Sequence, residues 1–282
     1  MKYVFFGTSE FSVTILEILY QNNFIPDLII TTPDRPKGRG LKLKPNPVKI
    51  WAQKNNIKFI EPEKLTRYVL PVTHYDLFII AAYGKIIPKE ILEIPEGGTL
   101  NVHPSLLPKF RGPSPIQSFI LSGEKETGVT IILADEKVDH GPIIAKSEIF
   151  NAESETYKEL EEKLARLGGN LLVEVLPKFL NGEIKPQEQN HSEATFTKKI
   201  TKEDGLIDLE KDPPELIERK IRALNPWPGV YTFINGKRLI ITKAKLTDSG
   251  LKILYIKPEG KKEINLKDYL RGNPNRFLER YL

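Results

Sequence analysis

The chain opens with KYVFFGTSEFSVTILEILYQNNFIPDLIIT, residues 2–31, and this stretch decides the class of fold. Its ends, residues 2–6 and 28–31, are apolar runs with the composition of buried strands. Between them, apolar side chains recur every three to four residues up to about residue 20, the spacing of one face of a helix. A strand, a helix and a strand in this order are typical of a parallel sheet with crossover helices. The sequence therefore predicts an α/β fold.

Later runs extend the predicted sheet. Residues 77–82 are apolar at every position, as expected of a central strand in a parallel sheet. Further strands are expected at 57–60, 98–102, 129–134 and 143–148, and helices at 47–55, 115–122 and 156–180. The first turn lacks G-x-G-x-x-G, and G-x-x-x-x-G-K-[ST] occurs nowhere. Nucleotide functions that depend on those phosphate-binding loops therefore lose their support.

The pattern changes after the long helix. Residues 185–206 are polar and aperiodic, which predicts a linker. Beyond a helix at 214–224, two strand-like runs flank Asn235-Gly236, a strong hairpin signal, and short strands follow. We therefore expect a mostly parallel, Rossmann-like catalytic domain in residues 1–184, the linker, and a small β-barrel in residues 207–282.

Composition excludes several classes of protein. The apolar content is 40% with no long apolar run, and the N-terminus has no signal-peptide pattern, so we expect neither a membrane span nor secretion. The chain has no cysteine, which excludes disulfide scaffolds, and its four histidines have no metal-ligand spacing, so we expect no metal. A cytoplasmic protein, and a monomer, is the expectation.

Charge is distributed unevenly. The net charge is +5, but residues 219–282 hold 15 Lys and Arg against 5 Asp and Glu, while the rest holds 27 against 32. A basic C-terminal segment on a mildly acidic body suggests contact with a phosphate backbone, although a solvated basic surface explains the count equally well.

The stretch NVHPSLLPKFRG, residues 101–112, carries the strongest chemical signal. Residues i and i+2 of a strand face the same side, so Asn101 and His103 point into one pocket at the end of a strand, where open α/β sheets bind ligands. An amide donates hydrogen bonds and an imidazole exchanges protons near neutral pH. A histidine at a strand end is nevertheless more often structural. A second element, Asp139, follows another strand-like run and supplies a carboxylate able to orient His103.

Three motifs together carry a resemblance. Residues 101–117, TGVTIIL at 127–133 and D-x-G-P-I at 139–143 resemble the 10-formyltetrahydrofolate-dependent formyltransferases. Within that family the chain resembles the members that formylate methionyl initiator tRNA. The resemblance implies transfer of a formyl group from 10-formyltetrahydrofolate to the α-amino group of methionine on that tRNA. It implies that Asn101, His103 and Asp139 are catalytic, and that the C-terminal domain is an OB-like tRNA-binding barrel, here shortened.

The resemblance also implies which residues bind the folate. In the family, the turn after the 77–82 strand and the 135–140 connection lie on the folate. The residues expected to bind it are Ser105, Leu106, Leu107, Pro108, Ile86, Ile87, Pro88, Ile91 and Asp135. The isoleucines among them suit an apolar wall for a heterocycle, although core packing is the commoner use of isoleucine.

A basic, proline-rich loop at 32–49 is similar to a tRNA-contacting loop of the family. It holds six Lys and Arg against one Asp, and so long a structureless loop in a compact domain is usually functional or disordered. The residues expected to bind tRNA are Arg35, Arg39, Lys42, Lys44 and Arg222. A sugar-nucleotide N-formyltransferase is the alternative function, since it shares the same catalytic set.

Overall fold

The computed structural model describes residues 1–37, 42–66, 69–70, 74–150 and 154–282. The chain divides into two compact units, each described by itself below. Unit 1 comprises residues 1–115, 126–150 and 161–197, and unit 2 comprises residues 116–125, 151–160 and 198–282. The division into two units does not test the domain limits expected from the sequence, which remain predictions. Residues 185–197 of the expected linker are part of unit 1.

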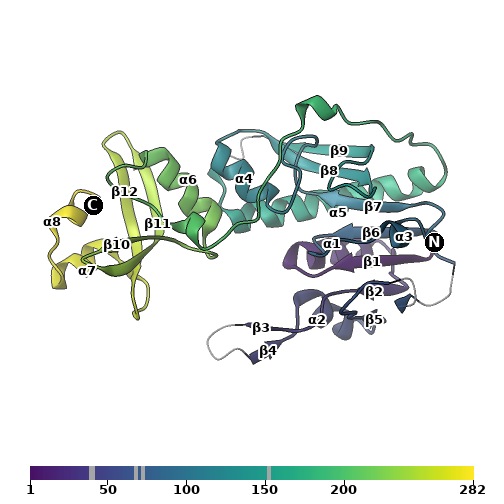
Figure 1. Ribbon diagram of the computed structural model, residues 1–282, viewed down its shortest axis with the longest axis horizontal. Helices are drawn as coiled ribbons and strands as arrows, with labels where there is room; N and C mark the ends of the chain where they lie inside the picture. The colour runs from purple at the N-terminus through teal and green to yellow at the C-terminus, as the bar shows by residue number, and fades with distance from the viewer. Residues whose placement is uncertain (38–41, 67–68, 71–73, 151–153) are drawn as a thin grey trace. The chain divides into compact units, whose positions relative to one another are not determined.

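Unit 1 is built on a seven-stranded sheet with strand order β5-β2-β1-β6-β7-β8-β9 (Figure 1). Its first five strands are parallel, and β8 and β9 run antiparallel to their neighbours. The strands are β1 (Tyr3–Gly7), β2 (Leu28–Ile30), β5 (Phe59–Ile60), β6 (Leu77–Ala81), β7 (Thr99–His103), β8 (Thr127–Leu133) and β9 (Ile143–Ile149). This confirms the α/β class and the mostly parallel sheet.

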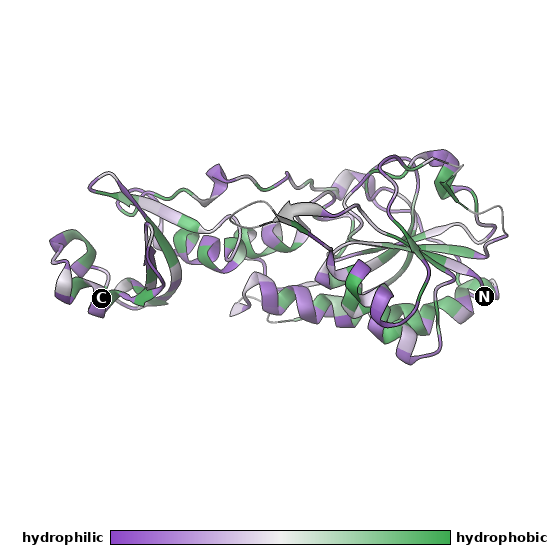
Figure 2. Cartoon of the chain, turned by 90° about the horizontal axis from the view of Figure 1, so that it is seen from below, coloured by the Kyte–Doolittle hydropathy of each residue, from purple (hydrophilic) through white to green (hydrophobic). Residues whose placement is uncertain are grey.

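The central strands are buried because helices cover the sheet. Every residue of β1 is buried, and hydrophobic residues concentrate along the strands in Figure 2. The helices of unit 1 are α1 (Glu10–Gln21), α2 (Pro47–Lys54), α3 (Lys89–Leu92) and, from residue 161 on, α5 (Tyr157–Leu180), whereas α4 (Pro115–Ser122) belongs to unit 2 except for its first residue. A Cβ at Gly168 of α5 would lie 2.7 Å from Val102 Cγ1 of β7. The glycine therefore lets α5 approach the strand that carries the candidate catalytic residues.

The basic loop is more regular than the sequence predicts. Residues 35–37 and 42–44 form the antiparallel pair β3 (Arg35–Lys37) and β4 (Lys42–Lys44). At its base, Asn46 Oδ1 accepts from Thr31 Oγ1 (3.0 Å) and from the Lys49 amide (3.0 Å), and Asn46 Nδ2 donates to Thr32 O (2.7 Å). The expectation of a structureless loop is wrong here, because cross-strand pairing and a buried asparagine fix both ends of the hairpin.

Unit 2 contains a four-stranded antiparallel sheet, β10-β11-β12-β13. Its strands are β10 (Val230–Ile234), β11 (Lys237–Thr247), β12 (Gly250–Pro258) and β13 (Ile264–Asn265), and its helices are α6 (Pro214–Leu224), α7 (Leu266–Gly272) and α8 (Arg276–Glu279). The predicted hairpin is confirmed: Asn235 and Gly236 both have positive φ, 50° and 75°. Within the described residues, the outer edge of β10 pairs with Leu206, through a bridge to Tyr231, and no pairing of β10 with β13 is present.

No helix among the described residues has the length and apolar character needed to cross a membrane.

Candidate active site

Strand β7 presents the first two candidate residues. Asn101 and His103 lie on it two residues apart, and β7 is held between β6, which is parallel, and β8, which is antiparallel. His103 is the last residue of the strand and is only 5% exposed. Both side chains therefore belong to the carboxyl end of the parallel strands, the edge at which open α/β sheets bind ligands.

Asp139 joins them from the loop between β8 and β9. Asn101 Nδ2 donates to Asp139 Oδ1 (3.1 Å), and His103 Nδ1 lies 3.4 Å from the same oxygen. The other carboxylate oxygen, Oδ2, accepts from the Gly112 amide at 2.7 Å. The three residues that the sequence predicts as catalytic are thus brought together around one carboxylate.

Contacts to both ring nitrogens fix the orientation of His103. Its Nε2 lies 3.0 Å from Phe110 O, and a carbonyl oxygen only accepts, so Nε2 carries a hydrogen. Its other ring nitrogen, Nδ1, faces Asp139 Oδ1. The imidazole is thus oriented by the Phe110 carbonyl on one side and by the Asp139 carboxylate on the other.

The Asp139 loop is tight and conformationally unusual. Asp139 has φ +50°, a left-handed conformation that few residues other than glycine adopt. A Cβ at Gly141 would lie 1.9 Å from Leu133 O, so the chain can pass there only without a side chain. The Leu133 amide closes the loop by donating to Pro142 O at 2.9 Å.

The loop after β7 has few side chains free to meet a ligand. Ser105 and Leu107 are fully buried, and the Ser105 hydroxyl donates to Lys109 O (2.7 Å). Thr130 Oγ1 accepts from the Leu107 amide (3.0 Å) and donates to Ser105 O (2.7 Å). Leu106 and Pro108 are half-buried. Ser105 and Leu107 therefore shape this loop from inside.

The turn after β6 divides its isoleucines in the same way. Ile91 is completely buried and Ile87 is 8% exposed, and both belong to the core cluster. Ile86 is 86% exposed, and Pro88 is half-buried. Ile87 and Ile91 are therefore core residues, whereas the side chain of Ile86 is exposed.

Two histidines lie beside the remaining folate candidate. His140 Nδ1 lies 2.7 Å from Asp135 Oδ2, and its ring stacks on His191 with a centroid separation of 4.1 Å. The Asp135 carboxylate is therefore held by a neighbour in its own loop. Within the described residues, no group of three or more His, Asp or Glu is placed to hold a metal ion.

The structure also reveals contacts that sequence reasoning missed. Gln189 is 5% exposed, and its Nε2 donates to Asp139 O (3.0 Å) and Gly141 O (2.7 Å). Its Oε1 accepts from Arg111 Nη2 at 2.6 Å, and Arg111 is 3% exposed. Gln189 lies in a polar, aperiodic stretch, so no local spacing marks it. Its partners are 48 to 78 positions away along the chain.

The predicted tRNA-binding residues have different environments. Arg35 and Lys42 lie on β3 and β4, Lys44 is exposed, and Arg39 falls outside the described residues. Arg222 is only 14% exposed: its Nε donates to Glu218 (2.7 Å) and its Nη1 to Glu155 O (3.1 Å). These contacts hold the Arg222 guanidinium within unit 2.

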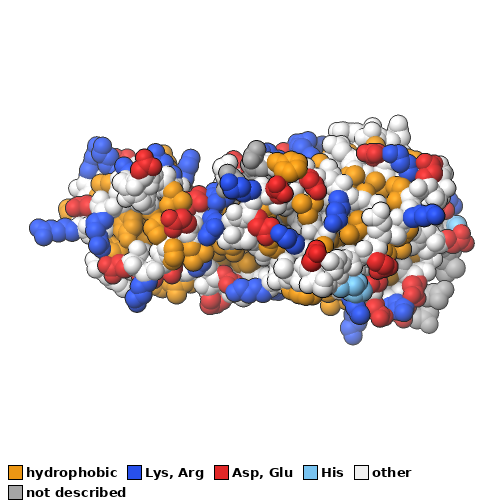
Figure 3. Space-filling model, turned by 90° about the horizontal axis from the view of Figure 1, so that it is seen from above, with side chains coloured by type: hydrophobic (Ala, Val, Ile, Leu, Met, Phe, Trp, Pro, Cys, Tyr) orange, Lys and Arg blue, Asp and Glu red, His pale blue; other side chains and the backbone are white. Residues whose placement is uncertain are grey.

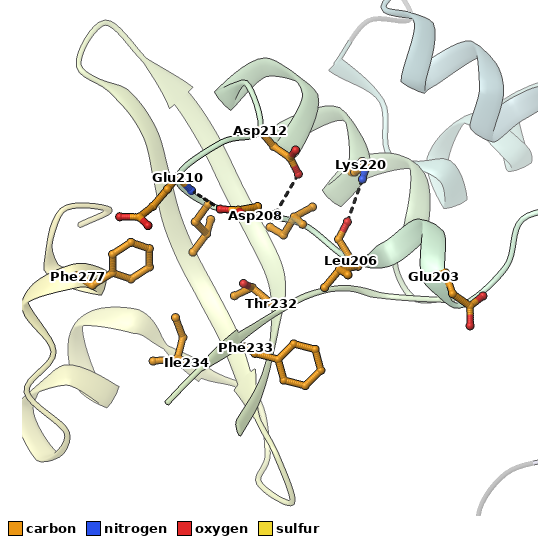
Figure 4. Close-up of a pocket in the computed structure, with 12 residues that line it drawn as sticks. Glu203, Leu206, Asp208, Glu210, Asp212, Lys220, Thr232, Phe233, Ile234 and Phe277 are labelled. Atoms are coloured by element: carbon orange, nitrogen blue, oxygen red, sulfur yellow. Dashed lines mark hydrogen bonds between the residues drawn. The ribbon is translucent and has the colours of Figure 1, made fainter. Parts of the chain in front are cut away.

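Unit 2 has a hollow of about 560 Å³ lined by residues 203–212, β10 and α8 (Figure 4). Four carboxylates line it, those of Glu203, Asp208, Glu210 and Asp212. The Glu210 amide donates to Asp208 (3.0 Å), and Lys220 Nζ is turned to Leu206 O (3.0 Å). An acidic lining of this kind repels phosphate, so this hollow does not suit an RNA backbone.

One face of the unit 2 sheet combines aromatic and basic side chains. Cross-strand partners share a face, and the pairs on this one are Tyr231 with Ile240, Ile240 with Lys257, Phe233 with Arg238, and Lys243 with Tyr255. The Arg238 guanidinium lies 3.8 Å from the centroid of the Tyr231 ring. Figure 3 shows Lys and Arg side chains among hydrophobic ones at this end of the chain. We call these residues the aromatic–basic face.

Comparison with known proteins identifies the family. Residues 1–176 match the model of the formyl transferase family, and residues 199–250 match that of the formyl transferase C-terminal domain. The methionyl-tRNA formyltransferase of Caldanaerobacter subterraneus subsp. tengcongensis is 38% identical over 97% of each chain.

Solved structures share the fold. An N-formyltransferase from Helicobacter canadensis, in complex with folinic acid and dTDP-3-aminofucose, superposes with a TM-score of 0.68 at 21% identity, covering 94% of this chain and 98% of that one. The methionyl-tRNA formyltransferase from Clostridium thermocellum gives 0.61 at 20% identity, covering 92% and 98%. These identities support the fold alone, whereas the family models and the curated relative extend over most of the sequence. The chain therefore belongs to the formyl transferase family and, within it, to the methionyl-tRNA formyltransferases, which are formyl-group transferases.

Proposed function

We propose that this enzyme transfers the formyl group of 10-formyltetrahydrofolate to the α-amino group of methionine on initiator tRNA, with Asn101, His103 and Asp139 at the reaction centre. The observation that carries the proposal is the convergence of Asn101 Nδ2 and His103 Nδ1 on Asp139 Oδ1, at 3.1 and 3.4 Å. An amide donor, an imidazole and a carboxylate in contact are the groups that acyl transfer to an amine requires.

The reaction forms one C–N bond and breaks another. The amine nitrogen attacks the formyl carbon, and the tetrahedral intermediate carries an oxyanion and a positive nitrogen. The bond from carbon to N10 then breaks, the amine loses a proton and N10 gains one, so the products are formylmethionyl-tRNA and tetrahydrofolate. α-Amino groups titrate near ~7.7–8.0, so a useful fraction of the nucleophile is neutral at physiological pH.

Each side chain has a distinct part in this sequence. Asn101 turns from Asp139 to the formyl oxygen and donates to the oxyanion, a contribution typically of about 10²–10³ in rate. His103 and Asp139, whose Nδ1 and Oδ1 atoms lie 3.4 Å apart, accept the amine's proton and return it toward N10. The Gly112 amide orients Asp139 by donating to its second oxygen.

The folate is proposed to lie along the loops next to this centre. Ile86, Leu106 and Pro108 are at least partly exposed and supply apolar contacts for a pterin ring. Asp135, held by His140, offers a carboxylate to polar ring atoms. Ser105, Leu107, Ile87 and Ile91 act from beneath, by fixing the backbone of the two loops.

Two surfaces are proposed for the tRNA. The β3–β4 hairpin carries Arg35, Lys42 and Lys44, and its base is braced by Asn46. Arg39, which lies outside the described residues, is proposed to bind the tRNA as well. The aromatic–basic face of unit 2 supplies cations for phosphates and rings for unpaired bases, the combination found on surfaces that bind single-stranded RNA. Arg222 is left out because its guanidinium is engaged inside unit 2.

One assay tests the acceptor. The enzyme is incubated with 10-formyltetrahydrofolate and, in parallel, with methionyl initiator tRNA, methionyl elongator tRNA or an amino-sugar nucleotide. Formylation of methionine, strongest on initiator tRNA, is the expected result. Formylation of the sugar nucleotide instead would replace the proposal with the alternative suggested by the shared fold.

A further inference from the structure

We infer that Gln189 is a positioning residue for Asp139, and that residues 187–197, here called the strap, are part of the active-site architecture. The inference rests on the proposed role of Asp139. It concerns a segment whose sequence suggests only a linker, and a side chain that contacts neither of the other two candidate catalytic residues.

The strap binds both loops that assemble the site. On one side, the Arg111 amide donates to Thr195 O (2.9 Å), the Thr197 amide donates to Arg111 O (2.7 Å), and the Phe110 amide donates to Thr195 Oγ1 (2.8 Å). These bonds fix residues 110–112, which supply the carbonyl for His103 Nε2 and the amide for Asp139 Oδ2. On the other side, the backbones of Gln187 and Ile143 exchange two hydrogen bonds, of 2.7 and 2.8 Å.

Gln189 acts at the centre of the strap. Both hydrogens of its amide are used, on Asp139 O (3.0 Å) and Gly141 O (2.7 Å). The orientation of the amide is unambiguous, because carbonyl oxygens only accept and the Arg111 guanidinium on its other side only donates. Gln189 therefore holds the carbonyls on either side of His140 and fixes the backbone from which the Asp139 side chain projects.

The conformation of Asp139 explains why such a hold is needed. A non-glycine residue at φ +50° persists only where its surroundings impose it, at a typical cost of about 1–3 kcal/mol. Without the two Gln189 bonds, the loop is free to relax and to move the carboxylate away from His103. A displacement of about 1 Å in a catalytic group typically costs about 10²-fold in rate.

Arg111 supports Gln189, although burying its charged guanidinium has an unfavourable free energy. Its buried guanidinium bonds to the neutral acceptors Gln189 Oε1 (2.6 Å) and His191 Nδ1 (2.9 Å) and, in the part of the chain that the structure describes, forms no ion pair. A buried cation without a carboxylate is unfavourable. The burial of this cation has a purpose if it locks the amide that orients Asp139.

The test is Gln189→Met, with Gln187→Met as the matched control. Gln187 lies on the same strap, but its side chain is exposed and its backbone bonds survive the substitution. Single-turnover formyl transfer is measured with saturating folate and tRNA, together with thermal unfolding and folate affinity. We expect Gln189→Met to lower the rate about 10²-fold with a folded protein and near-normal folate affinity, and Gln187→Met to match the wild type.

A double variant separates positioning from structural damage. If Gln189 acts through Asp139, then adding Gln189→Met to Asp139→Asn removes little further activity, because the positioned group is already gone. A near-normal rate for Gln189→Met overturns the inference, as does a loss of equal size in both backgrounds. If Gln189→Met fails to fold, Gln189→Glu is used instead: it keeps the side-chain volume but sets oxygen against the two carbonyls, and the same loss and the same non-additivity are expected. A near-normal rate for Asp139→Asn alone refutes the proposed function instead.

Discussion

The site in unit 1 and the aromatic–basic face of unit 2 use polar side chains in opposite ways. In unit 1, His103, Arg111 and Gln189 are each no more than 5% exposed, and His103 Nε2, Arg111 Nη2 and Gln189 Nε2 each have a hydrogen-bond partner within the protein. On the unit 2 face, Phe233 is 56% exposed, Tyr255 is 39% exposed, and the lysines extend into solvent. The site in unit 1 holds a few polar atoms in fixed positions, whereas the aromatic–basic face of unit 2 exposes positive charges to solvent.

This difference predicts how each region responds to mutation. When a buried side chain in a hydrogen-bonded network is removed, no water molecule replaces its hydrogen bonds. The full loss of those bonds therefore appears in the measured effect, and that effect depends on the neighbouring residues of the network. Solvent and salt screen the interaction of an exposed cation with a phosphate. Each such cation therefore contributes little to the free energy of tRNA binding, and their total contribution depends on the salt concentration. Substitutions in unit 1 should therefore change kcat, and those on the face should change tRNA affinity.

The largest effect is expected from the catalytic residues themselves. Asn101→Ala should lower kcat by about 10²–10³ because an oxyanion donor is lost, and Asp139→Asn by about 10²–10⁴ because proton transfer is lost. Steady-state formylation with each variant measures this, and circular dichroism checks the fold. Wild-type turnover in either variant would remove that residue from the reaction centre.

A smaller effect is expected on the aromatic–basic face. Lys243→Ala and Lys257→Ala should each weaken tRNA binding with little change in kcat. Each should also reduce the slope of log K against log salt by about 0.7–0.9 if it neutralises one phosphate. Titration of tRNA binding at several salt concentrations gives the slope. Lys211→Ala, an 85% exposed lysine in the segment that lines the acidic hollow, is the matched control and should leave the slope unchanged.

The smallest effect concerns the start of the unit 2 segment. The Asp204 carboxylate accepts from Lys198 Nζ (2.5 Å) and from the Thr201 amide (2.8 Å), and the Lys198 bond is the main cause that lowers the pKa of Asp204. A lowered folded-state pKa stabilises the fold above the unfolded pKa, and that stability is lost as pH falls through the folded value. Asp204→Asn should therefore cost less than about 1 kcal/mol at neutral pH and nothing in strong acid. Urea unfolding at both pH values measures the difference, and a cost that does not shrink on acidification would contradict this account.

Local patterns predict much of the fold and the three central residues. The apolar runs that became β1, β6 and β7 are uniformly buried or nearly so because each lies in the interior of a covered sheet, and such burial leaves a direct mark on composition. Asn101 and His103 are predictable for the same reason, since a strand fixes the direction of residues i and i+2.

The β3–β4 hairpin and the strap were not predictable in this way. Prolines and lysines at 32–49 carry no apolar alternation, so the pairing depends on the buried Asn46 at its base. Arg222 shows the converse: its charge suggests an RNA contact, but folding places Glu218 and the Glu155 carbonyl against it.

By itself the sequence determined the α/β class, the order of the strands along the chain and the residue types available for chemistry, because these depend on periodicity and on near neighbours. Tertiary structure alone decided that Asp139 reaches Asn101 and His103, and that Gln189, 50 positions further along the chain, holds the loop from which it does so. Hydrogen bonds between segments that are distant in sequence depend on the tertiary fold that brings those segments together, and the local spacing of residues does not predict such contacts.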